Sequence, residues 1–207
     1  MKTTVNYSPK TFAAIVIFYI SIGISLAQDG VGRITAVIGP VNIINGGTKE
    51  KSPAIKGGIL QENDLIQTEA GGKAKIILHD QTILSIGPEA ELVVDKFVLG
   101  GEANQGSVGV SFKKGLFKYL SGDVAKNKGD VQLKIPNAVI TVRGTSGTFN
   151  ITSGGDNSIA TTTGVLAVTS TTTGVTTEIS AGYQVTTNGN SGAVTQFISV
   201  AANCNAN

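Results

Sequence analysis

Residues 111–145 read SFKKGLFKYLSGDVAKNKGDVQLKIPNAVITVRGT, and this stretch decides the fold class. It contains short apolar runs at 116–120, 131–135 and 139–142, and segments with glycine, lysine or proline separate them. Runs of this length that are rich in valine, isoleucine and leucine are typical of β-strands. The stretch therefore predicts several strands that follow one another closely.

The same pattern extends on both sides. Further apolar runs occur at 34–38, 41–44, 65–68, 74–78, 82–86, 92–99 and 108–112. After residue 145 the chain is rich in Thr, Ser and Gly and carries TTTGV twice, and threonine favours strands. No helical stripe of useful length occurs outside the N-terminal segment. We expect an all-β protein of many short strands, arranged as a sandwich, a barrel or a β-solenoid.

The N-terminal segment has the pattern of a signal peptide. Two lysines precede an apolar stretch at 12–26, which ends near the small residues Ser25 and Ala27. The alternative is an uncleaved anchor, because the stretch is close to the length that spans a membrane. We expect a signal peptide at 1–27 with cleavage before Gln28, an all-β domain at 28–187 with Thr/Gly-rich closing strands from 146, and a final strand and frayed tail at 188–207.

Charge and rare residues exclude several function classes. The 16 Lys and Arg exceed the 14 Asp and Glu only through Lys2 and Lys10, so the processed chain has no net charge and no electrostatic case for nucleic acid. After Arg143 there is no further basic residue. One histidine and one cysteine, Cys204, argue against metal sites, disulfide frameworks and cofactors. This usage fits an exported bacterial protein of the periplasm or cell surface.

Two segments of the chain resemble the FecR domain family. Segment 60–99 resembles the first half, and segment 111–145 resembles the second half. The motif positions are Asn63-Asp64, Thr68-Glu69, Asp80-Gln81, Gly115, Phe117, Gly122, Pro136, Ala138 and Val142-Arg143-Gly144-Thr145. The first three pairs each depart at one residue from the family's Gly-Asp, Thr-Gly and Asp-Gly turns. Closing strands at 164–168 and 181–185 extend the resemblance to about residues 30–187.

The resemblance implies an all-β periplasmic module of sandwich or solenoid type. In the regulators that gave the family its name, this module senses an outer-membrane transporter and signals through a membrane helix to a segment that binds a sigma factor. Too few residues precede the apolar stretch at 12–26 to form such a segment. We therefore expect the exported module without a cytoplasmic anti-sigma segment.

Most polar clusters favour a structural interpretation. His79 and Asp80 fit a hairpin turn better than a catalytic pair. The carboxylate pairs Glu62/Asp64 and Glu89/Glu91 are two residues apart, as solvated strand charges often are. A basic run favours a solvated strand edge over a site for a polyanion such as lipopolysaccharide. It consists of Lys113, Lys114, Lys118, Lys126, Lys128 and Lys134.

Arg143-Gly144-Thr145 allows two interpretations. In the architectural one, Gly144 provides a bulge or a close backbone approach, Arg143 donates to neighbouring carbonyls, and loss of the Thr145 side chain is mild. In the other, the Thr145 hydroxyl attacks the Gly144 carbonyl and cuts the chain, as in some anti-sigma members of the family. We favour the architectural interpretation.

These observations predict a non-enzymatic module for envelope signalling or for binding an envelope protein or glycan. A structural or adhesin-like surface protein is the alternative, because residues 146–200 are rich in Thr and Gly and nearly uncharged. No integral span is expected after processing, and the ligand and the oligomeric state stay open.

Overall fold

The computed structural model describes residues 30–100 and 106–199. Its one described helix, α2 (Asp123–Lys126), is a single short turn, so the expected all-β fold is confirmed. The strands are β1 (Gly32–Ile38), β2 (Val41–Ile44), β3 (Lys51–Pro53), β4 (Ile59–Leu60), β5 (Leu65–Thr68), β6 (Lys73–Leu78), β7 (Ile83–Ile86), β8 (Glu91–Val98), β9 (Ser107–Leu120), β10 (Asp130–Ile135), β11 (Ala138–Ile151), β12 (Asn157–Ser170), β13 (Thr176–Ser180), β14 (Tyr183–Thr187) and β15 (Val194–Ser199).

Several sequence predictions fall on residues that lie outside the described part of the chain. These are the signal peptide at 1–27, its cleavage point before Gln28, Cys204 and the tail from residue 200. Within residues 30–100 and 106–199, no helix is long and apolar enough to cross a membrane.

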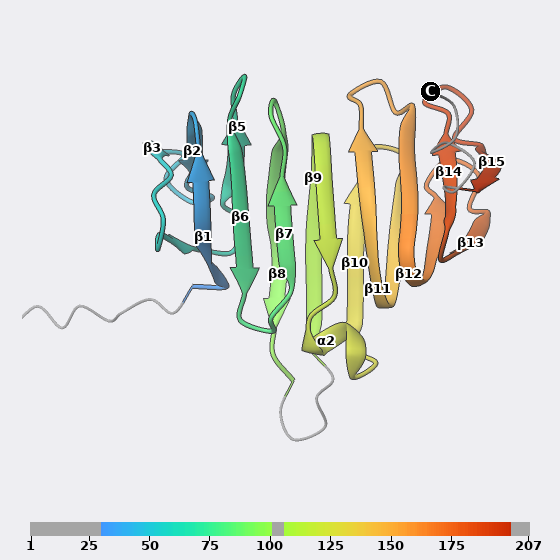
Figure 1. Ribbon diagram of the computed structural model, residues 1–207, viewed down its shortest axis with the longest axis horizontal. Helices are drawn as coiled ribbons and strands as arrows, with labels where there is room; N and C mark the ends of the chain where they lie inside the picture. Colours follow the sequence, from blue (N-terminus) through green and yellow to red (C-terminus); the bar gives the residue numbers. More distant parts are fainter. Residues whose placement is uncertain (1–29, 101–105, 200–207) are drawn as a thin grey trace, which may run out of the picture.

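The strands form two layers, which we call layer A and layer B, on either side of one core (Figure 1). In layer A the order is β3, β2, β5, β8, the first half of β9, β10, the first half of β11, the second half of β12, and β13. In layer B the order is β4, β1, β6, β7, the second half of β9, the second half of β11, the first half of β12, β14 and β15. Alternation along the strands gives this arrangement its core, as in β6, where Ala74, Ile76 and Leu78 are buried.

Three long strands pass from one layer to the other, and a glycine with positive φ lies at each crossing. Gly115 of β9 has φ 109°, Gly144 of β11 has φ 60°, and Gly164 of β12 has φ 73°. The pairing partners change at these points: β9 pairs with β8 and β10 before Gly115 and with β7 and β11 after it. Glycine reaches such backbone angles without the steric penalty of a Cβ. The glycines therefore allow one strand to serve both layers.

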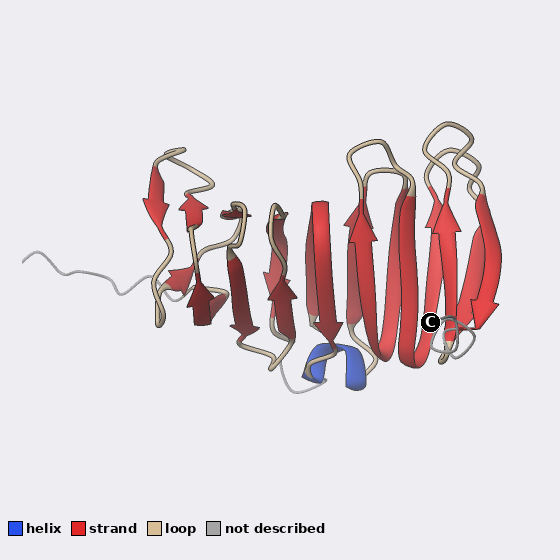
Figure 2. Cartoon of the chain, turned by 45° about the horizontal axis from the view of Figure 1, so that its top comes forward, coloured by secondary structure: helices blue, strands red, loops and turns tan. Residues whose placement is uncertain are grey.

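The turns and crossings collect along two rims, which lie at the top and bottom of Figure 1. The first rim contains Gly115 and the turns at 39–40, 69–72, 87–90 and 136–137. The second rim contains the β6–β7 turn at 79–82, the end of β9 at 121–122, and the crossings at 144–145 and 164. Figure 2 shows the loops along both ends of the row of strands, with α2 at the second rim.

The structure corrects two sequence interpretations. The runs at 108–112 and 116–120 belong to one continuous strand, β9, because Gly115 bends the strand without ending it. The interpretation of the basic run as a strand edge is wrong for Lys113, Lys114, Lys118 and Lys134. These lysines lie on β9 and β10, which have neighbours on both sides in the middle of the sheet.

Candidate functional site

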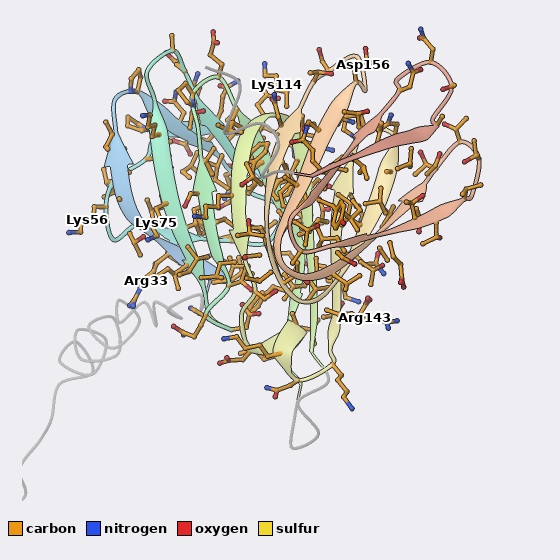
Figure 3. The ribbon with its side chains drawn as sticks, turned by 45° about the vertical axis from the view of Figure 1, so that its right-hand side comes forward. Arg33, Lys56, Lys75, Lys114, Arg143 and Asp156 are labelled. Carbon is orange, nitrogen blue, oxygen red and sulfur yellow. The ribbon has the colours of Figure 1, made fainter. Side chains whose placement is uncertain are left out.

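The candidate site is a groove at the second rim, between α2 and the first half of β11. It encloses about 650 Å³, a volume typical of small-ligand sites. Its lining residues are Ala125, Lys126, Lys128, Gly129, Asp130, Thr141, Val142, Arg143 and Gly144. We call it the Arg143 groove. Figure 3 shows Arg143 close to α2, at the opposite end of the strands from Lys114 and Asp156.

The local topology creates the groove. The chain leaves β9 at the second rim, forms α2, and returns so that β10 pairs in parallel with the first half of β9. A parallel pairing requires a crossover connection, and here that connection contains α2 and residues 127–129. The crossover stands beside the point where β11 changes layers, and the groove lies between them.

A β-bulge shapes the wall that carries Arg143. Arg143 pairs with Val165 and Ser146 pairs with Thr163, so Gly144 and Thr145 together oppose Gly164. Two residues opposite one is the definition of a bulge, and bulges re-aim side chains beside functional sites. A Cβ on Gly144 would meet nothing within 4 Å, whereas a Cβ on Gly164 would lie 2.8 Å from Thr145 Oγ1. At position 144, glycine is therefore required only because of the positive φ. At position 164, it is required because of both the positive φ and the close packing.

Thr145 is fixed to Ser121 by reciprocal hydrogen bonds. The Thr145 backbone N–H donates to Ser121 Oγ at 2.8 Å, and the Ser121 hydroxyl and backbone N–H both donate to the Thr145 carbonyl, at 2.6 and 3.1 Å. The Thr145 hydroxyl lies 2.9 Å from the carbonyl oxygen of Val165 and 3.2 Å from that of Arg143. Thr145 is 1% exposed. Because this buried hydroxyl donates to backbone carbonyls, we expect its removal to cost more stability than the mild effect expected from the sequence.

The hydrogen bonding continues to the β6–β7 turn. Asp80 accepts from the backbone N–H of Thr82 at 3.0 Å and from its hydroxyl at 2.8 Å, and the Gly122 N–H donates to Thr82 Oγ1 at 3.1 Å. Gly122 is required here, since a Cβ would lie 2.2 Å from the Asp80 carbonyl oxygen. The structure thus brings Asp80, Gly122 and the Arg143-Gly144-Thr145 cluster together on the second rim.

The other predicted motif residues lie elsewhere and support turns. Thr68 is buried at the first rim, where its hydroxyl donates to the Gly87 carbonyl at 2.7 Å and accepts from the Ala90 N–H at 2.8 Å. Gly115 lies at the β9 crossing, and Pro136 is exposed in the β10–β11 turn. Asp64 is buried and accepts from the backbone N–H groups of Gly46 and Gln61, at 3.0 and 2.9 Å.

The remaining acidic and histidine candidates show no catalytic geometry. Glu62 is exposed while Asp64 is buried, so the two differ completely in environment. Burial would raise the pKa of Glu91, but hydrogen bonds from Lys114 and Gln67 and the charge of Lys114 lower it below its usual value. His79 is exposed in the β6–β7 turn, with its ring 6.2 Å from that of Phe97. In the described ranges, no three His, Cys, Asp or Glu side chains gather to hold a metal ion.

The same geometry bears on the cleavage interpretation. Nucleophilic attack by a hydroxyl requires a base that accepts its proton. The hydrogen-bond acceptors of the Thr145 hydroxyl are the carbonyl oxygens of Arg143 and Val165, neither of which is a base. The arrangement at Gly144-Thr145 fits the architectural interpretation.

Sequence reasoning did not single out Ser121, Thr82 or Gly164. Ser121 and Thr82 act through contacts with residues 24 and 40 positions away in the chain, which no local pattern reveals. A signal existed for Gly164, because an isolated glycine within a strand pattern often marks a bulge.

Comparisons with known proteins agree with this architecture. The FecR protein family matches residues 64–167, half of the chain, and no curated protein matches the sequence. Two crystal structures of a candidate anti-sigma factor from Parabacteroides distasonis ATCC 8503, at 1.65 and 2.50 Å resolution, share the fold, with TM-scores of 0.53 and 0.52 and 13% sequence identity. Each comparison covers 65% of this chain and 59% of the other. The family match contains the second-rim residues Asp80, Gly122 and Arg143-Gly144-Thr145, and the protein belongs to the FecR family.

Proposed function

We propose that this protein is an exported, non-enzymatic FecR module that binds an envelope protein or glycan through the Arg143 groove, as part of envelope signalling. The observation that carries the proposal is a groove of about 650 Å³ beside Thr145, whose backbone is held by buried hydrogen bonds to Ser121. Membership of the FecR family supports a signalling role, and so does the fold shared with a candidate anti-sigma factor.

The fixed wall favours binding over catalysis. Ser121 and Thr145 hold the backbone beside Arg143, and Gly122 ties the same rim to the β6–β7 turn. A site built in advance loses little conformational entropy when a ligand binds. The lining of the groove contains one carboxylate, Asp130, and one hydroxyl, Thr141. Asp130 accepts hydrogen bonds from Gln132, and among the described residues no hydrogen bond joins it to Thr141, so no base is paired with a nucleophile there.

Site-specific cross-linking tests the binding role. A photoreactive amino acid replaces Lys126 in the groove, and as control it replaces Lys75, which is exposed on the outer face of layer B (Figure 3). We expect a discrete adduct in envelope extracts from position 126 and none from position 75. Absence of an adduct from position 126, together with hydrolytic activity of the purified protein, would contradict the proposal.

Export has its own test. N-terminal sequencing of the protein from the periplasm or medium should begin at Gln28. Material that retains Met1 in a membrane pellet would show an anchor instead.

A structural or adhesin-like role is the second candidate, and one observation favours it. Toward the C-terminal end of layer B, the outward register row passes from Lys118 to Thr148, Ala160 and Gln184, and the last three carry no charge. Cell fractionation separates the two roles, because a surface component should resist release by osmotic shock and a periplasmic module should not.

A further inference from the structure

We propose that the Arg143 groove takes an oxyanion, that is, a carboxylate, phosphate or sulfate group carried by its ligand. The inference rests on the proposed function, because it specifies the chemistry that the same groove recognises. It is based on which charged side chains in and around the groove already have a partner of opposite charge and which do not.

The charged residues of the groove are Lys126, Lys128, Asp130 and Arg143. Lys126 Nζ lies 3.6 Å from Asp123 Oδ1, so a neighbour on α2 already balances its charge. The carboxylate of Asp130 accepts from the Gln132 amide, with 3.2 Å to each oxygen, rather than from a cation. Across the part of the chain that the structure describes, Arg143 and Lys128 have no ion pair. Two open positive charges therefore line one groove.

The two cations stand on constrained backbone. Arg143 immediately precedes the bulge, and Val142 before it is buried. Lys128 has φ 63°, a region that lysine seldom occupies. The planar guanidinium offers several N–H donors in a fork that matches the oxygens of a carboxylate or phosphate. The backbone that carries the two donor side chains is therefore positioned in advance.

A second hollow indicates how the ligand lies. On the other side of Arg143, a hollow of about 370 Å³ is lined by Thr141, Arg143, Gly164, Val165, Ala167 and Glu178. Arg143 and Glu178 leave this hollow with no net charge, whereas the α2 side has Lys126, Lys128 and Arg143 against Asp130. The anionic group therefore belongs on the α2 side. Neither hollow is lined by an aromatic ring, which argues against recognition of a neutral sugar face by stacking.

Arg33 provides a matched control. It is exposed like Arg143, but it lies on β1 in layer B, where the register places it between Ile59 and Ile77. Lys75, on the neighbouring strand β6, is the corresponding control for Lys128.

The test is an NMR titration of the ¹⁵N-labelled protein with inorganic phosphate, sulfate or acetate at constant ionic strength. We expect saturable shifts at residues 126–130 and 141–144 with at least one of these anions. Phosphate and sulfate against acetate distinguish a tetrahedral from a planar group. Arg143→Gln and Lys128→Gln should each weaken binding at least about fivefold, while Arg33→Gln and Lys75→Gln leave it unchanged. Unchanged thermal melting of the exposed-site variants will show that they fold.

Two outcomes overturn the inference: no saturable shift at the groove with any of the three anions, or equal weakening by Arg143→Gln and Arg33→Gln. The proposed function and the oxyanion inference can fail independently of each other. Cross-linking from position 126 without oxyanion binding would remove only the ligand class, and oxyanion binding without cross-linking would remove the envelope partner.

Discussion

The rings of Phe112 and Phe117 stack with their centroids 4.4 Å apart and their planes 13° apart, although both residues belong to β9. In an extended strand, residues five apart lie roughly 16 Å apart and point to opposite faces. The rings meet because β9 bends at Gly115 on its way from layer A to layer B. Phe149 of β11 packs on the same group, with its ring centroid 5.3 Å from that of Phe112. The crossing therefore builds the aromatic centre of the core.

Gly115→Ala should lower the free energy of unfolding by at least about 3 kcal/mol. The added Cβ would lie 2.2 Å from Ala90 Cβ and 2.6 Å from Ala90 Cα, at a φ of +109°. Gly109→Ala on the same strand is the control, because its Cβ would lie 3.4 Å from Lys96 Cβ and should cost less than about 1 kcal/mol. Urea unfolding followed by circular dichroism measures both, and equal losses would contradict the role given to the bend.

Gly164→Ala should be more damaging than Gly144→Ala. At Gly144 the cost is that of a positive φ alone, about 1–2 kcal/mol. At Gly164 the same cost is joined by contacts of 2.8 Å to Thr145 Oγ1 and 2.9 Å to the Gly144 carbonyl oxygen. Thermal melting of the two variants side by side gives the comparison. A larger loss at Gly144 would mean that the bulge is packed differently.

Ser121→Ala and Thr145→Ala should each cost about 1–3 kcal/mol, because Ser121→Ala leaves the buried Thr145 N–H without its acceptor and Thr145→Ala removes a buried hydroxyl that donates to backbone carbonyls. Ser180→Ala, at an exposed position of β13, should have little effect. Intact-mass spectrometry of the folded wild type should show one species that is stable over days. Two fragments that meet between Gly144 and Thr145, and that disappear in Thr145→Ala, would instead establish self-cleavage.

The buried phenol of Tyr119 leads us to expect that the folded protein loses stability at high pH. Burial raises the pKa of its phenol from 10.0 to about 12, and the charge of Asp80 adds to the effect. Because folding favours the protonated phenol, the resulting stability is complete below pH 10 and is lost as the pH rises toward 12. In Tyr119→Phe this loss should be absent from the unfolding free energy measured between pH 8 and 12. Tyr183→Phe, at an exposed position, should follow the wild type throughout.

The sequence was sufficient to predict most strands and turns, because apolar runs and turn residues are local signals. The turns form at the expected positions even where another residue stands in place of the family's glycine, because Asn63 and Gln81 adopt positive φ values of 68° and 67°. The crossings at Gly115 and Gly144 could not be predicted, because an alternating pattern looks the same whether a glycine ends a strand or bends it. The lysines of β9 and β10 were wrongly assigned to a strand edge for a related reason, since neither charge nor exposure reveals how many neighbours a strand has.

For the candidate site, Arg143-Gly144-Thr145 could be identified from sequence, but its surroundings could not. Ser121 meets Thr145 only through the pairing of β9 with β11, and Lys128 enters the groove only through the crossover that follows α2. Such contacts depend on topology, which a single sequence specifies only weakly.

The passage of β11 through both layers limits how this chain can be divided. Its composition changes abruptly at Arg143, where the basic residues end, and this position looks like a boundary between two modules. Yet Arg143 lies within β11, which pairs with β10 before Gly144 and with β9 after it. The charged and uncharged portions therefore cannot be exchanged as independent modules. A recombination event at this point would sever a strand on which both faces of the molecule depend.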